Sequence, residues 1–260
     1  NAKDYAWGGA KYNTGNGIIL IGVADLINSI VAVKHVVFDT SQLTMSQLIT
    51  ALDHDFEGYD DILQRCNSAP KYGNDDPLVD QIASDIFTFF ADEIEKYESK
   101  FGKMTPGILP VSGNTPFGLE VGALPSGKKA WKPLADGVSP VGGTDLNGPG
   151  SVLKSVASIP HDRFVQGTLL NLKVEPALLS EENGIKQMMA LLKSMCSLGV
   201  YHVQFNVIDQ EKLLLAQQYP DDYRGLLVRV AGYTAYFVEL GKDVQDEIIG
   251  RTVQHGISVG

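Results

Sequence analysis

The stretch from residue 164 to residue 218 alternates between strand-like and helix-like patterns, and this order constrains the fold more than any other feature of the chain. Phe164–Val174 and Val200–Val207 are typical of strands, whereas Glu181–Ser197 and Asp209–Gln218 are typical of helices. The first helix ends before Gly199, which suits a helix C-terminus, and the second begins at an aspartate, which suits an N-cap. Two strands joined through a helix pair in parallel, so the sequence predicts an α/β fold.

Three segments of the N-terminal half predict helices. Ile18–Phe38 is apolar at most positions and predicts a largely buried helix that passes into a short apolar segment. Thr44, with Gln47 three residues later, forms a capping-box signature for a helix that reaches Leu52. Val79–Glu98 is amphipathic. The residues expected on its core face are Ile82, Ile86, Phe89, Phe90 and Ile94.

Two polar segments resemble ligand-binding sites, but one lacks the spacing and the other lacks the second cluster of ligands that such sites need. Gly118–Gly150 holds eight of the 27 glycines and four prolines, so we expect loops and short extended pieces. Within it, Gly122–Lys129 lacks the spacing of a phosphate-binding Walker loop and predicts structural turns. The acidic run from Asp53 to Asp61 has no second cluster to converge with, so a solvated helix end is favoured over a metal site.

Charge and cysteine content exclude several classes of protein. The chain has 21 basic and 31 acidic side chains and a formal charge of −10, which disfavours nucleic acids and anionic membranes as partners. No apolar run is long enough to span a bilayer. Cys66 and Cys196 belong to no CxxC pair, so we expect neither a zinc site nor a disulfide framework, and a cytoplasmic location fits best. Residues 1–2, Asn1 and Ala2, are expected to be the remnant of a cleaved tag.

A pentapeptide near the end of the chain lies between two strand-like segments, Leu226–Val230 and Tyr233–Phe237. Taken alone, its glycine, Gly232, predicts a bulge or tight bend. The strand upstream carries polar residues on one face, including Gln204 and Asn206, which fits either an ordinary polar layer or hydrogen bonds to a nearby backbone. The pentapeptide reads Arg229-Val230-Ala231-Gly232-Tyr233.

The context of the pentapeptide is more specific than the motif itself. Tyr201–Asn206 and Tyr219–Arg224 precede it, and Phe237–Leu240 and Gln245–Thr252 follow it. In order and spacing these segments resemble the C-terminal segment of the glycyl radical enzymes of the pyruvate formate-lyase superfamily, and the resemblance extends from about Gly8 onward. Around the pentapeptide the sequence is more similar to the branch of glycerol dehydratase, isethionate lyase and arylacetate decarboxylase than to formate acetyltransferase proper.

The resemblance implies a fold and a division into parts. Members of this family form a ten-stranded β/α barrel in which two finger loops meet at the centre. One loop carries a glycine that stores a radical, and the other carries a cysteine that attacks substrate. This chain would supply the C-terminal part of the barrel domain over residues 3–180 and a glycine radical domain over residues 181–260.

The resemblance assigns radical storage to Gly232. A radical on Cα is stabilised by conjugation with the amide groups on both sides, and a side chain would crowd that planar centre. Glycine also gives the loop freedom to leave its pocket and return. The residues expected to support the loop are Arg229, Val230, Ala231, Tyr233, Gln204 and Asn206.

The resemblance also implies partners. A radical S-adenosylmethionine activating enzyme would install the radical with its own iron–sulfur cluster, so no metal or bound cofactor is expected on this chain. The remaining expected partners are the N-terminal part of the same enzyme, a small-molecule substrate and, for the full-length form, a second copy in a homodimer.

Neither cysteine resembles the one that attacks substrate, because that residue sits in a Gly-Cys-x-Glu type of loop. Cys66 follows Arg65 and is expected at a helix end, and Cys196 is expected to be a small buried hydrophobe. The chain alone is therefore expected to lack turnover.

The segment from Pro110 to Gly118 aligns with the stretch that crosses near the substrate cavity in the family. A loop with a purely structural role explains it equally well. Its candidates for lining the pocket are Ser112, Asn114, Thr115 and Phe117.

Two rival functions stay open at this point. The chain can be read as a stand-alone spare part that carries the radical and binds a damaged enzyme. It can also be read as a non-catalytic α/β domain in which Gly232 only bends the backbone.

Overall fold

A computed structural model of the chain describes residues 2–4, 9–11, 16–109, 112–179 and 182–254. Its helices are α1 (Val23–Val33), α2 (Met45–Asp53), α3 (Asp60–Ser68), α4 (Pro77–Ile94), α5 (Asn114–Gly118), α6 (Gly148–Val156), α7 (Pro176–Leu179), α8 (Glu182–Leu198), α9 (Gln210–Gln218) and α10 (Lys242–Gly250). A π-helical turn and three 3-10 turns are η2 (Lys34–Asp39), η3 (His161–Arg163), η4 (Pro220–Tyr223) and η5 (Phe237–Glu239). In these ranges no helix has both the length and the apolar character needed to cross a membrane.

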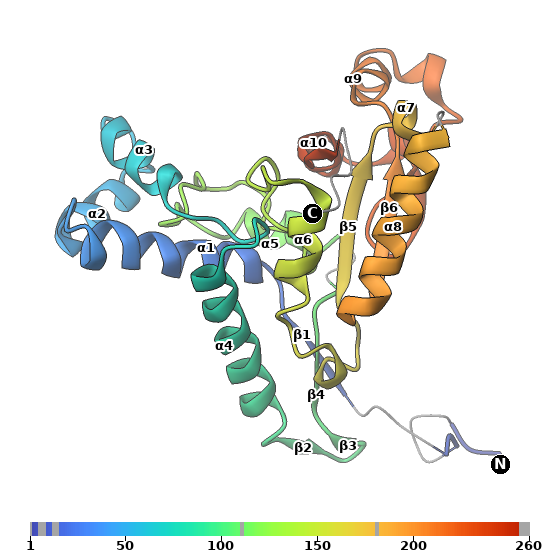
Figure 1. Cartoon of the computed structure of the whole chain (residues 1–260), viewed down its shortest axis with the longest axis horizontal. Helices are drawn as coiled ribbons and strands as arrows, with labels where there is room; N and C mark the ends of the chain where they lie inside the picture. The colour runs from blue at the N-terminus through green and yellow to red at the C-terminus, as the bar shows by residue number, and fades with distance from the viewer. Residues whose placement is uncertain (1, 5–8, 12–15, 110–111, 180–181, 255–260) are drawn as a thin grey trace.

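The strands are β1 (Gly17–Ile19), β2 (Glu98–Ser99), β3 (Gly102–Lys103), β4 (Thr105–Gly107), β5 (Leu169–Val174), β6 (His202–Val207), β7 (Leu227–Arg229), β8 (Thr234–Tyr236) and β9 (Val253–Gln254). Helices α1 to α4 lie to the left in Figure 1, and β5, β6 and α8 lie to the right.

The main strands run parallel, as the strand–helix order predicts. β5 pairs in parallel with β6 along its whole length and with β9 on its other edge. β1 pairs in parallel with β4, and a parallel bridge between Ile108 and Thr168 joins the end of β4 to the start of β5. Helices α7 and α8 connect β5 to β6, as a parallel crossover requires. The predicted α/β architecture is therefore confirmed.

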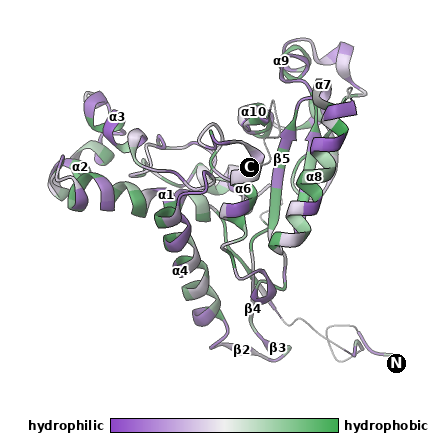
Figure 2. Cartoon of the chain, in the orientation of Figure 1, coloured by the Kyte–Doolittle hydropathy of each residue, from purple (hydrophilic) through white to green (hydrophobic). Residues whose placement is uncertain are grey.

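The two faces of the β5–β6 pair differ in chemistry. Successive side chains of a strand point to opposite faces, and residues in register on parallel strands share a face. Leu170 and Leu172 of β5 belong to the main core, and Val203 and Phe205 of β6 pack against it. That core also takes up residues of α6 and α8, so these helices cover the apolar face (Figures 1 and 2). The opposite face carries four buried polar side chains, which are those of Asn171, Lys173, Gln204 and Asn206.

The first apolar segment is divided differently from the prediction. Ile18 and Ile19 belong to β1 and not to a helix, because branched side chains suit the strand that pairs with β4. The helix begins at Val23 and then widens into the π-helical turn η2. The capping box that Thr44 and Gln47 predict is confirmed, with both reciprocal bonds present at the start of α2.

The buried face of α4 is shifted from the predicted stripe. Asp76 caps this helix by accepting from the backbone N–H groups of Leu78 and Val79. Phe89 is 58% exposed, so its assignment to the core was wrong. Small residues let α4 lie close to α1, and this close approach favours an alanine-rich face over the aromatic one. The buried residues are Val79, Ala83, Phe87, Ala91 and Ile94.

A separate small core holds the segment that carries Gly232. It joins α9, the β7–β8 hairpin and α10 around buried apolar side chains. Asp209 caps α9 as predicted, by accepting from the N–H of Glu211 at 2.8 Å. The buried members of this core are Ile208, Leu213, Ala216, Val228, Val230, Phe237 and Ile248.

The predicted loop segment between Gly118 and Gly150 runs across the start of β5. Asp25 of α1 anchors it, because the carboxylate Oδ2 accepts from the N–H of Ala135 at 2.6 Å. Gly137 follows with a positive φ of 57°, and a Cβ at this position would lie 2.1 Å from the carbonyl oxygen of Leu169. Only glycine permits this close approach, so the segment is held tightly against β5.

Asp25 makes stability depend on pH. Burial, the largest cause, raises the pKa of this carboxyl from its ordinary 3.8 to about 6, although the Ala135 N–H and Lys128 act in the opposite direction. Between these two values the folded protein holds a proton that the unfolded chain lacks. The free energy of unfolding should therefore fall as pH rises from about 4 to about 6 and stay lower above that range.

We predict that Asp25→Asn raises the free energy of unfolding at pH 8 by about 1–2 kcal/mol, because it removes a buried charge and keeps an oxygen acceptor for Ala135. The gain should shrink at pH 4. Urea denaturation at both pH values measures it, with Asp53→Asn as the exposed control. An equal gain at both pH values would contradict the role given to this carboxyl.

Candidate functional site

Gly232 lies in the tight turn between β7 and β8. The two strands pair antiparallel, and the N–H of Val230 donates to the carbonyl oxygen of Tyr233 at 2.9 Å to close the turn. The φ of Gly232 is +85°, in the left-handed region that residues with side chains rarely adopt. Space is not the constraint, because a Cβ would meet only the side chain of Leu109, at 3.7 Å. Gly232 is solvent-exposed in this chain.

The buried amides of β6 hold this turn. Asn206 bonds both backbone groups of Arg229: its Oδ1 accepts from the N–H at 2.9 Å, and its Nδ2 donates to the carbonyl at 2.6 Å. Gln204 Oε1 accepts from the N–H of Gly232 at 3.0 Å. Gln204 and Asn206 on the polar face of β6 thus form hydrogen bonds with the backbone of the turn. This was one of the two interpretations of that face, the other being an ordinary polar layer.

The other residues of the pentapeptide fill separate positions. Val230 and Ala231 are buried, and Tyr233 packs at the edge of the small core with Val230. Arg229 extends into solvent, and its Nη1 donates to Thr234 Oγ1 at 2.9 Å. The turn is therefore anchored by apolar side chains on one side and by amides on the other.

A chain of polar contacts leads from Gln204 into the interior. Gln204 Nε2 donates to Asn171 Oδ1, its neighbour in register on β5. Asn171 Nδ2 donates to Asp136 Oδ2, and the backbone N–H of Asn171 donates to Ser139 Oγ at 2.9 Å. The segment that follows Ala135 thus meets the polar face of the sheet.

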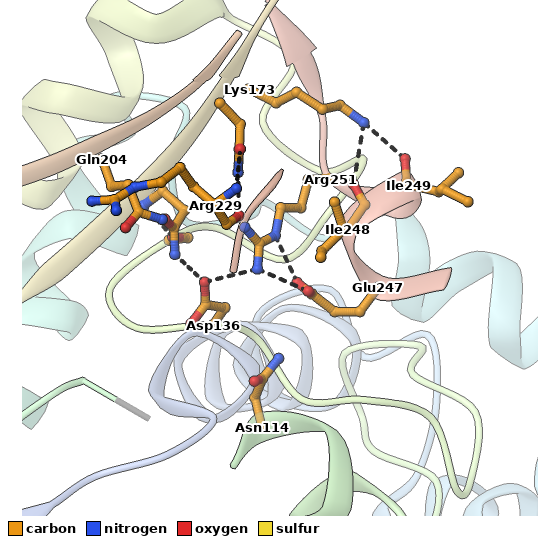
Figure 3. Close-up of polar contacts among 12 residues, drawn as sticks. Asn114, Asp136, Lys173, Gln204, Arg229, Glu247, Ile248, Ile249 and Arg251 are labelled. Atoms are coloured by element: carbon orange, nitrogen blue, oxygen red, sulfur yellow. Dashed lines mark hydrogen bonds and ion pairs between the residues drawn. The ribbon is translucent and has the colours of Figure 1, made fainter. Parts of the chain in front are cut away.

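The chain of contacts ends at a buried ion-pair cluster. Arg251 Nη2 lies 3.3 Å from Asp136 Oδ2, and the same guanidinium donates to both oxygens of Glu247, at 2.9 and 2.8 Å. Figure 3 shows Arg251 between the two carboxylates. Burial raises the pKa of Asp136 to about 7, with Arg251 opposing the rise and Glu247 adding to it.

Lys173 connects the sheet to the end of α10. Its Nζ donates to the carbonyl of Ile249 at 2.8 Å and, at 3.4 Å, to that of Ile248 (Figure 3). Burial, followed by the charge of Arg251, lowers the pKa of Lys173 to about 8. A cation at the C-terminal carbonyls of a helix is favourable, so this contact fixes α10 against β5.

A cavity of about 360 Å³ lies beside this cluster, between the 131–145 segment and α10. Its lining includes Asp136, Asn171, Lys173, Glu247 and Arg251. Gly232 is not among the described residues that line it. The cavity therefore accompanies the ion-pair cluster and not the glycine turn.

The structure places the four candidates for the substrate pocket in or beside a short helix. Ser112 precedes α5, whereas Asn114, Thr115 and Phe117 belong to it, so the expected loop is partly helical. Asn114 and Thr115 are buried, and Asn114 Nδ2 donates to the carbonyl of Leu134 at 3.2 Å. Phe117 is 58% exposed. Pro110, at the start of this segment, lies outside the described residues.

Of the two cysteines, Cys66 lies at a helix end as expected, whereas Cys196 does not lie in the expected environment. Cys196 is exposed, so the expectation that it is buried was wrong. It lies on the outer side of α8, whereas Leu191 of that helix packs inward. Cys66 is fully buried in the last turn of α3, and burial raises the pKa of its thiol. In the described part of the chain no group of three or more His, Cys, Asp or Glu side chains is arranged to hold a metal.

Several site residues gave little signal in the sequence. Asn171 interrupts an otherwise apolar strand, and Asp136 lies among glycines and prolines. A polar residue inside a buried strand is a usable signal, because it must find a partner. Arg251 lies in the segment after the pentapeptide, and nothing in the local sequence indicates its partner more than 100 residues earlier.

Comparison with known proteins agrees with this geometry. The pyruvate formate lyase-like family model matches residues 1–118, and the glycine radical family model matches residues 134–238. The trans-4-hydroxy-L-proline dehydratase of Clostridioides difficile is 42% identical over 97% of this chain and 32% of its own length. The isethionate sulfite-lyase of Bilophila wadsworthia is 40% identical over 89% of this chain and 28% of its own length.

A solved structure is similarly close. The glycerol-bound form of the B12-independent glycerol dehydratase from Clostridium butyricum superposes with a TM-score of 0.92 and 42% identity, over 96% of this chain and 32% of that one. The chain thus spans about a third of the length of the relatives it matches. With both family models, the sequence relatives and the fold in agreement, the chain belongs to the glycyl radical enzymes of the pyruvate formate-lyase superfamily, in the branch that contains dehydratases and isethionate lyases.

Proposed function

We propose that this chain stores an organic radical on the α-carbon of Gly232 and passes it to a cysteine elsewhere in a full-length dehydratase or lyase. The observation that carries the proposal is the position of Gly232 in a tight turn with its N–H held by Gln204. Stored on a backbone carbon, the radical is delocalised over two amide groups. The residues that hold those amide groups therefore set the geometry of the radical centre.

Transfer of the radical is a hydrogen-atom exchange. The thiol of the partner cysteine gives its hydrogen atom to the Gly232 α-carbon, so that the S–H bond breaks, the C–H bond forms and the unpaired electron moves to sulfur. Such a step needs the two atoms close together, and the rest of the enzyme would cover the exposed turn for this purpose. Arg229, Val230, Ala231, Tyr233 and Asn206 would hold the turn in its docked position.

An activating enzyme would install the radical. We propose that S-adenosylmethionine and an iron–sulfur cluster, both on that partner, supply the abstraction of the first hydrogen atom. The turn would have to leave its place to reach the partner, and the freedom of glycine at φ +85° suits this motion. The N-terminal part of the enzyme, a small-molecule substrate and a second copy of the full-length protein complete the proposed assembly, in the cytoplasm.

The substrate pocket would lie near the segment that carries Ser112, Asn114, Thr115 and Phe117. Leu109, just before this segment, is the side chain nearest to the position of a Cβ on Gly232. The short distance supports a pocket between the two segments.

Gly232→Ala should abolish the radical. The added methyl group opposes planarity at Cα, and the left-handed backbone costs an alanine about 1–2 kcal/mol. The measurement is electron paramagnetic resonance of the full-length protein after anaerobic activation. Wild type should give a doublet from the single α-hydrogen left on Gly232, and the variant should give no doublet. Gly225→Ala is a matched control, because a Cβ there meets nothing within 4 Å and its φ is not in the left-handed region. A doublet that persists in Gly232→Ala would contradict the proposal.

Substitution of either cysteine should leave turnover of the activated full-length enzyme within a few-fold of wild type. Neither Cys66 nor Cys196 lies in a Gly-Cys-x-Glu loop. Cys196→Ser should be silent because the residue is exposed, whereas Cys66→Ser should lower the free energy of unfolding by about 1–2 kcal/mol because it buries a hydroxyl. Anaerobic assays and urea denaturation measure the two effects. Loss of turnover with the doublet and the fold intact would show that one of these thiols is the reacting one.

A further inference from the structure

The hydrogen bonds between Gly232 and Asp136 form a chain with one consistent direction. A backbone N–H can only donate, so Gln204 must turn its carbonyl oxygen toward Gly232. Gln204 Nε2 then faces Asn171 and needs an acceptor, which Asn171 Oδ1 provides. The Nδ2 of Asn171 is left to donate to Asp136 Oδ2. Each amide orientation is thus fixed by the one before it.

Charge anchors the far end of the chain. Asp136 also faces Arg251, whose guanidinium is held in place by both oxygens of Glu247. Asp136 Oδ2 faces both Arg251 Nη2 and Asn171, and an oxygen that faces a guanidinium accepts hydrogen bonds and does not donate them. The pair therefore requires the Nδ2 of Asn171, and not its oxygen, to point toward Asp136.

The opposite orientation of the two amides would release the turn. If the side-chain amide of Asn171 were flipped, its Nδ2 would face Gln204. Gln204 would then have to accept that hydrogen bond with its own side-chain oxygen. Gln204 Nε2 would then oppose the N–H of Gly232. Two donors would meet, and the backbone donor would lose its acceptor.

We propose that Asn171 and Asp136 are positioning residues for the glycine turn: they fix the amide of Gln204 so that its oxygen holds the N–H of Gly232. Their importance to the enzyme rests on the proposed radical storage, but the geometric claim does not. Through Asn171 and Gln204, α10 and the 131–145 segment thus set the orientation of the glycine turn. Along this chain of contacts, neither element forms a hydrogen bond with the turn itself.

Hydrogen exchange of the full-length protein before activation tests the proposal, with the Gly232 amide as the readout. Asn171→Leu keeps the size of the side chain and removes the acceptor for Gln204, so exchange should rise about tenfold. Gln204→Leu should raise it by a similar factor. In the Gln204→Leu background, Asn171→Leu should add less than about twofold, because its effect passes through Gln204.

Two variants of Asp136 test the far end of the chain of contacts. Asn171 Nδ2 and Arg251 Nη2 both contact Asp136 Oδ2. In Asp136→Asn the amide oxygen can take that position and accept from both groups, so hydrogen exchange at Gly232 should stay within about threefold of wild type. Asp136→Leu removes the acceptor and should raise exchange toward that of Asn171→Leu. A role in packing alone predicts no difference between the two variants.

Asn28→Leu is the matched control. Asn28 is also buried, and its Oδ1 accepts from the backbone N–H of Tyr72, away from the chain of contacts. It should change thermal stability without selective exchange at Gly232. The proposal is overturned if Asn171→Leu leaves the amide protected, if its effect is undiminished without Gln204, or if Asp136→Asn exchanges as fast as Asp136→Leu. None of these readouts needs a radical, so failure of radical storage and failure of this proposal are distinguishable.

Discussion

The in-register parallel pairing of β5 with β6 is the constraint on which the site depends. It places Asn171 beside Gln204 and Lys173 beside Asn206 on one buried face. The opposite face is apolar and is covered by α6 and α8, so the polar face cannot turn outward without exposing Leu170 and Leu172. These four buried polar side chains need hydrogen-bond partners. The backbone of the glycine turn provides partners for two of the four, Gln204 and Asn206. The packing that forms the sheet therefore also positions the polar side chains of the site.

Two further elements close on this face. The 131–145 segment is held by Asp25 and by the close approach of Gly137 to Leu169, and it brings Asp136 to Asn171. α10 is held by Lys173 at its C-terminal carbonyls, and the arginine just beyond it meets Asp136. An ion pair buried in this way adds little net stability, because desolvation offsets the attraction. Its role in this structure is to fix orientation.

Local patterns predicted the fold well, whereas contacts between distant segments escaped them. The capping box at Thr44 and the cap at Asp209 depend on neighbours along the chain, and both are confirmed. The strand order and the family were also predictable, because the motif around Gly232 is continuous in sequence. The core face of α4 was predicted wrongly, since close helix packing selected alanines over Phe89. The contact between Asp136 and Arg251 joins residues more than 100 positions apart, and a single sequence carries no signal for it.

The central claim is that Gly232 is the residue that stores the radical, and the position of oxygen cleavage tests it most directly. A radical on the backbone adds dioxygen, and the chain then breaks at that carbon. Mass spectrometry of activated full-length protein after exposure to air should show two fragments whose masses place the break at Gly232, at the tip of the β7–β8 turn. An uncleaved chain in a sample that carried the doublet, or a break at another glycine, would contradict the account.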